Sequence, residues 1–366
     1  MKKRYMIILI CLVFSLIGCS RQKMNRDRTD SNTSNRLYMQ TSGNVGSTEQ
    51  RYFFPASYSE QSGKINIKCN LEVPQEFEMY NFHIPKVKDL RQYNTGKAYT
   101  YFIEGKEILE EQVQLKNTYY TLTDGSSIAI GECLSYDLPE SEIYRRIIRS
   151  SERMAPQRDF SFGTGDSCVT KIKELLEGIN YPIEEFSFSW FSTSGKEYSI
   201  LEQRAYEDNV IGSKELKSGG WTEDNDAYEI YAWQIYENIP IFPQIMTTNM
   251  TRAVESYQRA PISAVYNKKG LLTLMAEAPY EFESTEEIAV FKSFSEIAKN
   301  LIKKYENLLD DCSYSVTRAK LAIRVYFDKK QQYQAEPVWY FEVYDNEFNM
   351  EIAMFNAITG KEIYLR

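Results

Sequence analysis

The feature that most constrains the fold is a pattern in the C-terminal part of the chain that occurs twice. Each copy begins with apolar residues three and four positions apart, which indicate a helix, and continues with residues that alternate as in strands. The first helix is predicted at 167–179, with Ser167 as its cap. The second is predicted to begin at Ser284, where Ser284 and Glu287 match a capping box. The pattern therefore predicts two related units, each a helix followed by a meander.

The strand segments of the two copies also correspond. AYEIYAWQIY matches PVWYFEVYD in kind and place, and ISAVYNKKGLL matches IAMFNAITGKEI, including the asparagine a few residues before the turn glycine. AYEIYAWQIY carries large rings on both faces, so we expect neighbours on both sides of it, where the two copies meet. The predicted strands are 186–190, 227–236, 262–267 and 271–276 in the first copy, and 321–327, 338–345, 351–356 and 361–365 in the second.

The repeats follow a smaller, mostly β region at 51–156. Residues 64–73 alternate as a half-buried strand, and Asp124-Gly125 is typical of a tight hairpin turn. A helix is predicted at 98–109, interrupted or ended near Gly105, although Tyr and Thr in this segment also fit a strand. Another helix is predicted at 141–154. The predicted fold class is α+β, with helices packed on antiparallel sheets. The predicted domains are 51–156, 160–280 and 281–366, and we expect 160–366 to fold without 20–155.

The N-terminus determines where the chain is expected to reside. Lys2, Lys3 and Arg4 precede an apolar run at 5–17, which is shorter than a transmembrane helix requires. The run ends in Leu16-Ile17-Gly18-Cys19, which resembles the lipobox of bacterial lipoproteins. That resemblance implies a signal peptide at 1–18 and an acyl chain on Cys19, which anchors the protein in membrane lipid on the extracytoplasmic face of the cell membrane. An ordinary secreted protein or an uncleaved anchor is the alternative.

Residues 19–50 are polar and aperiodic, as in a disordered tether. Removal of 1–18 takes away three cations and leaves 40 Lys and Arg against 51 Asp and Glu, a formal charge of about −11. Such a surface lacks the cationic excess that nucleic-acid binding requires, so no nucleic-acid partner is expected. Four cysteines remain in the folded part, and both disulfides and buried free thiols are consistent with them. A pairing of Cys69 with Cys133 and of Cys168 with Cys312 is one arrangement considered.

A second resemblance covers the C-terminal repeats. The order helix, strand, WYFEV-type strand and AxTGK-like turn resembles PepSY-type domains and the tandem ectodomains of membrane-anchored regulators of a cell-wall sensor kinase. Trp339, Tyr340, Phe341, Thr359 and Gly360 carry it. It implies a non-catalytic regulator that contacts a membrane or cell-wall-associated protein. The lipid anchor, the extra region 52–156 and an insertion at 194–225 depart from those proteins. The predicted interaction surface consists of Trp233, Tyr236, Trp339, Thr359 and Gly360.

An enzyme is the less favoured class. His83 is the single histidine, and no GxSxG, P-loop or GxGxxG motif is present. We therefore predict no catalytic residue, no metal site and no cofactor. A lipoprotein that binds a sugar or peptide is the alternative function, because rings of Trp221 and of the AYEIYAWQIY segment could stack on such a ligand. Core packing is the stronger interpretation of those rings.

The lipobox leads to the first testable prediction. Cys19→Ser is expected to move the protein from the membrane fraction to the soluble fraction, because stable anchoring requires acyl chains that only the cysteine can receive. Fractionation of cells that express either form measures this. A variant that stays as firmly bound as the parent would show that an uncleaved apolar segment is the anchor.

Overall fold

The computed structural model describes residues 54–74, 77, 79–150, 157–242, 260–347 and 349–364. All of them belong to one compact unit, Tyr52–Arg366. The predicted signal peptide, Cys19 and the tether at 19–50 lie outside the described residues, so the expectations about them stay predictions.

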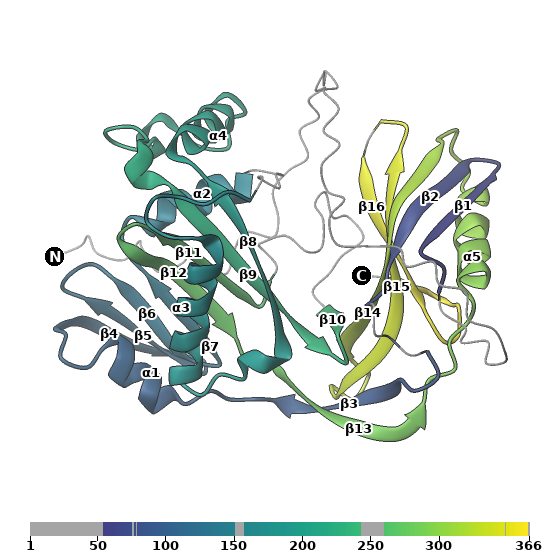
Figure 1. The fold of residues 1–366 in the computed structure, drawn as a ribbon, viewed down its shortest axis with the longest axis horizontal. Helices are drawn as coiled ribbons and strands as arrows, with labels where there is room; N and C mark the ends of the chain where they lie inside the picture. Colours follow the sequence, from purple (N-terminus) through teal and green to yellow (C-terminus); the bar gives the residue numbers. More distant parts are fainter. Residues whose placement is uncertain are drawn as a thin grey trace, which may run out of the picture. The chain divides into compact units, whose positions relative to one another are not determined.

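The described chain is an α+β fold, as the sequence predicts, and Figure 1 shows its helices lying against strands. The helices are α1 (Thr95–Phe102), α2 (Ser141–Ser150), α3 (Gly165–Gly178), α4 (Gly195–Glu207) and α5 (Phe294–Glu306). The strands are β1 (Ser57–Ser62), β2 (Ile65–Glu72), β3 (His83–Leu90), β4 (Ile108–Gln114), β5 (Asn117–Leu122), β6 (Ser127–Gly131), β7 (Cys133–Asp137), β8 (Phe186–Thr193), β9 (Ala227–Tyr236), β10 (Ile239–Phe242), β11 (Ile262–Asn267), β12 (Gly270–Glu277), β13 (Tyr280–Ile288), β14 (Tyr314–Phe327), β15 (Tyr333–Asp345), β16 (Met350–Asn356) and β17 (Glu362–Ile363).

Hydrogen-bonded pairing connects fifteen of the described strands into one sheet. The order is β17-β16-β15-β14-β10-β9-β11-β12-β7-β6-β5-β4, with β2 also on β14, β1 on β2 and β8 on β9. Most neighbours are antiparallel, but β2 and β10 both run parallel to β14. β3 and β13 form a separate two-stranded ribbon.

The two predicted repeats have the same construction. α3 precedes the strands β8, β9, β11 and β12, and α5 precedes β14 to β17, in each case as an antiparallel meander. The buried stripe of α3 includes Val169, Ile172 and Leu176, and that of α5 includes Ile297 and Leu301. Each stripe packs in its own core with side chains of its own meander. The periodicity of apolar residues therefore predicted both helix-on-sheet units.

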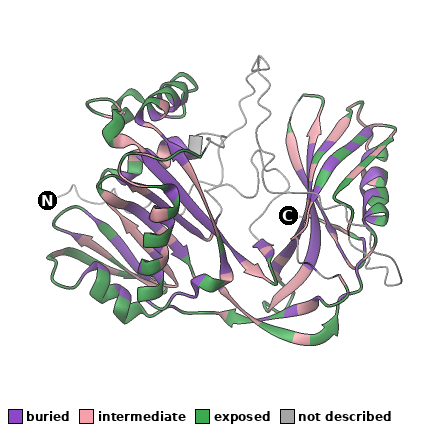
Figure 2. Cartoon of the chain, in the orientation of Figure 1, coloured by how far each residue is buried: buried purple, intermediate pink, exposed green. Residues whose placement is uncertain are grey.

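Strand β9 is buried on both faces, as its rings predict (Figure 2). Tyr228 and Ile230 belong to the core beneath α3. Tyr231 and Trp233 point to the other face and join a separate core with Tyr340 and other residues of the second meander. Alternate side chains of one strand thus contact two different cores, and the copies meet along this strand.

The strands of the N-terminal region complete the sheets of both repeats. β2 pairs with β14 and contributes Ile65, Ile67 and Leu71 to the core beneath α5. β7 pairs with β12, so that β4 to β7 extend the first meander. Residues 51–156 therefore contribute to both units, although the sequence predicts a region of its own. The predicted boundaries between the three domains stay a prediction.

One predicted helix boundary is wrong, and another lies near its expected place. The helix predicted at 98–109 ends at Phe102, close to Gly105, because the chain reverses at Gly105, whose φ is +77°. The chain then continues as β4, the strand that the sequence also allowed for this segment. The helix predicted to begin at Ser284 begins at Phe294. Ser284 instead pairs with Pro85 in the β13–β3 ribbon, and the capping box is made by Ser293 and Glu296. Both serines match the same motif, and only the pairing with β3 distinguishes them.

Smaller differences concern the first repeat. Thr164, one turn earlier than the predicted Ser167, caps α3 and accepts a hydrogen bond from the Ser167 backbone nitrogen at 3.1 Å.

The insertion at 194–225 contains α4, which begins with a capping box of its own and packs against α2. There the Trp221 ring stacks on Tyr198 at a centroid distance of 4.8 Å. The insertion thus adds a small core, in which the Trp221 ring is half-buried.

The shared strands lead to a prediction about fragments. Residues 160–366 alone are expected to show no cooperative thermal unfolding, because they lack Ile65 and Ile67, each worth about 1.5–3 kcal/mol when buried. The fragment also leaves the β12 edge that pairs with β7 exposed. Circular dichroism during heating measures this, with fragment 52–366 as the control. A cooperative transition in both fragments would instead support the independent folding expected from sequence.

Candidate functional site

The structure separates the five residues of the predicted interaction surface. Trp339 is fully buried in the core beneath α5, where its ring centroid lies 4.8 Å from that of Phe294. Trp233 is 5% exposed, and Tyr236 is half-buried beside Phe82 and Phe282. These three rings pack in cores, so the prediction that they form a contact surface is wrong for Trp233 and Trp339.

The other two residues lie together at the turn between β16 and β17. Thr359 is exposed, and Gly360 is buried beneath it. The Asn356 Oδ1 atom organises this turn by accepting a hydrogen bond from the Thr359 backbone nitrogen at 2.7 Å. In the first repeat Asn267 Oδ1 accepts one from the Lys269 backbone nitrogen at 2.8 Å. The asparagine that the two copies share therefore has the same role in both turns.

The four cysteines are free thiols in the structure. Cys69 lies in the core beneath α5 and Cys168 in the core beneath α3. Because β2 and β7 belong to different units, the considered pairing of Cys69 with Cys133 is not formed, and Cys312 is likewise not joined to Cys168. Burial raises the pKa of Cys69 to about 11 and also raises the pKa of Cys133 and Cys168. Such thiols carry little thiolate at neutral pH and are poor nucleophiles.

Helix α5 turns a polar face toward the β16–β17 turn. Asn300, Lys303, Lys304 and Asn307 recur at three- and four-residue spacing, which places them on one side of the helix. The Asn300 Nδ2 atom donates a hydrogen bond to the Gly360 carbonyl oxygen at 2.8 Å and so joins the helix to the turn. The apolar stripe on the opposite side fixes this orientation.

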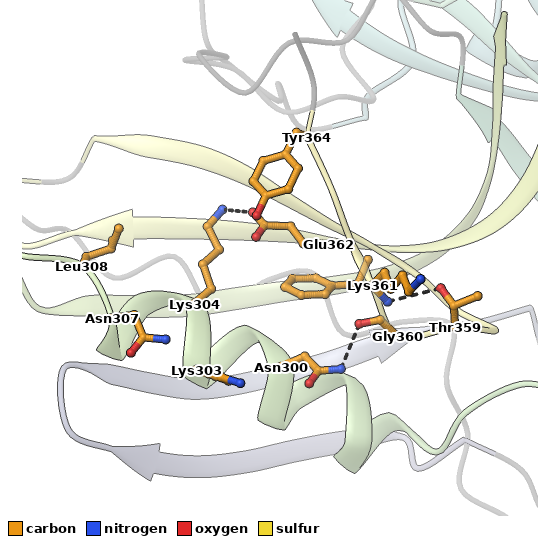
Figure 3. Close-up of a pocket in the computed structure, with 11 residues that line it drawn as sticks. Asn300, Lys303, Lys304, Asn307, Leu308, Thr359, Gly360, Lys361, Glu362 and Tyr364 are labelled. Atoms are coloured by element: carbon orange, nitrogen blue, oxygen red, sulfur yellow. Dashed lines mark hydrogen bonds and ion pairs between the residues drawn. The ribbon is translucent and has the colours of Figure 1, made fainter. Parts of the chain in front are cut away.

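The helix face and the turn enclose an open groove with a volume of about 610 Å³ (Figure 3). Its lining combines ammonium, amide and hydroxyl groups with a phenol and two apolar side chains. The lining residues are Asn300, Lys303, Lys304, Asn307, Leu308, Phe355, Thr359, Gly360, Lys361, Glu362 and Tyr364. Thr359 and Gly360, predicted from sequence, are therefore part of the groove.

The groove is cationic, with three lysines against one glutamate. Lys304 Nζ lies 2.9 Å from Glu362 Oε1, and both side chains are less than one-fifth exposed. Lys303 and Lys361 are exposed and form no ion pair within the described part of the chain. Since the whole chain has a formal net charge of −8, these two free ammonium groups give the groove a charge opposite to that of the protein.

The groove offers hydrogen-bond donors and positive charge to an anion. Lysine ammonium groups and asparagine amides bind carboxylates and phosphates. Among the lining residues there is no cysteine, serine or histidine. His83 lies elsewhere, at the start of β3 opposite Ile288. Among the residues that the structure describes, no group of three or more His, Cys, Asp and Glu side chains could hold a metal.

Rings that could stack on a sugar or peptide are mostly buried. Tyr228 is fully buried, and Tyr231 and Trp233 are less than one-tenth exposed. Tyr364 in the groove is 72% exposed. The exposed aromatic surface expected for a solute binder is therefore not found along β9. None of the described helices is long and apolar enough to cross a membrane.

Comparison with known proteins shows the fold alone. The sequence matches no protein-family model and no curated protein. An uncharacterized protein from Eubacterium rectale ATCC 33656 has a similar crystal structure, with a TM-score of 0.58 and 14% identity over 85% of this chain and 94% of that one. The Bacillus megaterium YpeB C-terminal domain gives a TM-score of 0.29 and 10% identity over 73% of this chain and 92% of that one, which is too low to carry an argument.

Sequence reasoning identified the turn and missed the helix that faces it. The sequence alone does not mark Asn300, Lys303 and Lys304 as site residues, although they lie opposite the predicted apolar stripe of the helix. The stripe shows which side of a helix is polar. It does not show which distant segment that side approaches, and Asn300 and Gly360 are 60 positions apart in the chain.

The turn leads to a prediction about stability. Gly360 has a φ of +71°, and a Cβ there would lie 2.9 Å from Asn300 Nδ2 and 3.0 Å from Lys292 Cδ. Gly360→Ala is expected to lower the free energy of unfolding by about 1–3 kcal/mol. Gly178→Ala is the control, because a Cβ there has no neighbour within 4 Å and alanine favours the helix. Urea unfolding measures both, and equal effects would contradict the strained-turn explanation.

Proposed function

We propose that this chain is a non-catalytic interaction module, anchored in the membrane through Cys19, that binds a partner protein at the cell surface. The partner contributes an acidic segment that lies in the groove between α5 and the β16–β17 turn. The two exposed lysines without ion pairs, Lys303 and Lys361, are the observation that carries this proposal.

The form of the groove favours a polypeptide segment over an enclosed small molecule. Asn300, Lys303, Asn307, Thr359 and Lys361 are exposed, so much of the lining faces solvent. Enclosed ligand pockets are mostly apolar and bury most of the ligand surface. Charges at an open site act on the rate of encounter and on partner choice, which suits recognition of an acidic surface.

The resemblance to PepSY-type regulator ectodomains supports the class of function, and the structure limits which residues can take part. Trp339 and Phe341 of the resembling motif are fully buried. These rings can maintain the fold, and they cannot contact a partner without unfolding. Contact through the exposed turn at Thr359 is consistent with both observations.

A double charge reversal tests the proposal. A photo-crosslinker placed at Thr359 in living cells is expected to capture one recurring membrane or wall-associated protein. Lys303→Glu with Lys361→Glu is expected to reduce that capture by about tenfold or more, since each reversal replaces an attraction by a repulsion. Quantitative blotting of the cross-linked product measures the change.

The matched control is Lys329→Glu with Lys330→Glu in the exposed β14–β15 turn, which changes net charge equally. It is expected to leave capture unchanged. If the control reduces capture as strongly, net charge and not the groove determines binding. Capture of unrelated surface proteins by the unmodified chain would also contradict the proposal.

A further inference from the structure

Strand β4 forms one end of the sheet. It pairs with β5 on one side, in regular register from Glu110 opposite Thr121 to Gln114 opposite Asn117. No described strand pairs with its other side. Figure 1 shows β4 at the outer end, beyond β5 and β6. Backbone groups on such a free edge are available to a strand from another molecule.

The edge carries apolar side chains that the fold does not cover. Leu109, Val113 and Leu115 are 70%, 75% and 83% exposed. Exposed single apolar residues are common, but here three of them lie within one edge strand and its turn. None of these three side chains belongs to a hydrophobic core of the described residues.

Other free edges in the described residues differ from β4. β17 has two residues, and β1 has the polar sequence SYSEQS. The free side of β8 is partly occupied, because Gln157 Nε2 donates a hydrogen bond to the Trp190 carbonyl oxygen at 3.1 Å. β13 is interrupted by two irregularities in its register with β3. Shortness, polarity and bulges are the usual means of protecting an edge. β4 has one irregularity in its register with β5, between Ile108 and Glu110, and from Glu110 to Gln114 it has only its charges.

Those charges are acidic and without ion pairs. Glu107, Glu110 and Glu111 are exposed, and none forms an ion pair within the described residues. Lys116 in the adjacent turn is already paired with Glu132. A strand that pairs with the free side of β4 therefore has two successive residues opposite the carboxylates of Glu110 and Glu111. Another of its residues lies opposite the apolar side chain of Val113.

We propose that β4 is a docking edge for an extended segment of another protein in which two adjacent basic residues are flanked by apolar ones. In an antiparallel arrangement, residues opposite Val113, Gln112, Glu111 and Glu110 would be apolar, polar, basic and basic. Directly opposite residues of opposite charge stabilise a strand pair, and main-chain hydrogen bonds supply the rest of the affinity.

A second copy of the chain fits this edge less well. The antiparallel self-pairing that overlaps all of β4 is centred on Glu111 and places Glu111 opposite its own copy. Like charges directly opposite destabilise a strand pair. The acidic pair thus disfavours self-association while it favours a basic strand. The edge also lies at the opposite end of the strand order from the groove beside β17, so this proposal does not depend on the proposed function.

The test uses the full chain in detergent micelles and a labelled peptide with Val-Thr-Lys-Lys-Val at its centre. Fluorescence anisotropy is expected to show saturable binding with a Kd of about 1 mM or below, which weakens as salt is added. Peptide binding is expected to protect backbone amides of 108–114 from hydrogen exchange. No saturable binding, or protection elsewhere, would overturn the proposal.

Glu110→Lys with Glu111→Lys is expected to weaken this binding at least tenfold and to create binding of the peptide with Glu-Glu at its centre. The matched control is Glu286→Lys with Glu287→Lys, another exposed adjacent pair in a strand. An equal loss in the control would show that net charge alone attracts the peptide and would overturn the proposal. Self-association of the chain that becomes stronger in the variant with Glu110→Gln and Glu111→Gln would also overturn the proposal. It would identify a second copy of the chain as the occupant of the edge.

Discussion

The two-sided burial of β9 is the constraint on which the rest of the structure depends. One face of the strand lies in the core beneath α3, and the other packs through Trp233 against Phe242, whose ring in turn contacts Tyr340. Both ring pairs have centroids 5.7 Å apart. Aromatic side chains bury 150–250 Å² each, so this shared core couples the two repeats through apolar area as well as through strand pairing.

This coupling explains why the most recognisable motif is not the most exposed one. VWYFEV forms the middle of β15, with Trp339 and Phe341 facing α5 and Val338 and Tyr340 facing β9 and β10. Both faces of the strand are occupied by packing. The positions that remain available to a partner lie at the margins of the sheet. There, helix ends, turns and unpaired strand edges carry exposed polar groups.

Two margins carry opposite charge. The groove beside β17 has two exposed lysines without ion pairs, and the β4 edge has the exposed carboxylates of Glu110 and Glu111, which form no ion pair among the described residues. Surface charges contribute little to stability, and they act on which partner approaches and how fast. An acidic protein with one cationic groove and one acidic, partly apolar edge therefore has two surfaces that favour different partners, and the proposals can be tested separately.

The sequence by itself determined the elements that local chemistry specifies. Apolar spacing identified α3 and α5, alternation identified β2, and aromatic composition identified β9. Asn267 and Asn356 marked turns that their side chains do organise. Where two segments carry the same local motif, the sequence does not show which of them begins the helix. Ser284 and Ser293 both match a capping box, and pairing with β3 converts the first into strand.

Only the tertiary structure decided which segments meet. β2 lies beside β14, β7 beside β12, and Asn300 against Gly360, and none of these pairs is close in sequence. Likewise, the large rings of Trp233 and Trp339 suit a contact surface as well as a core, and their burial settles the matter. The physical reason is that spacing and composition report which side of an element is apolar, whereas the identity of its neighbour depends on contacts among all elements at once.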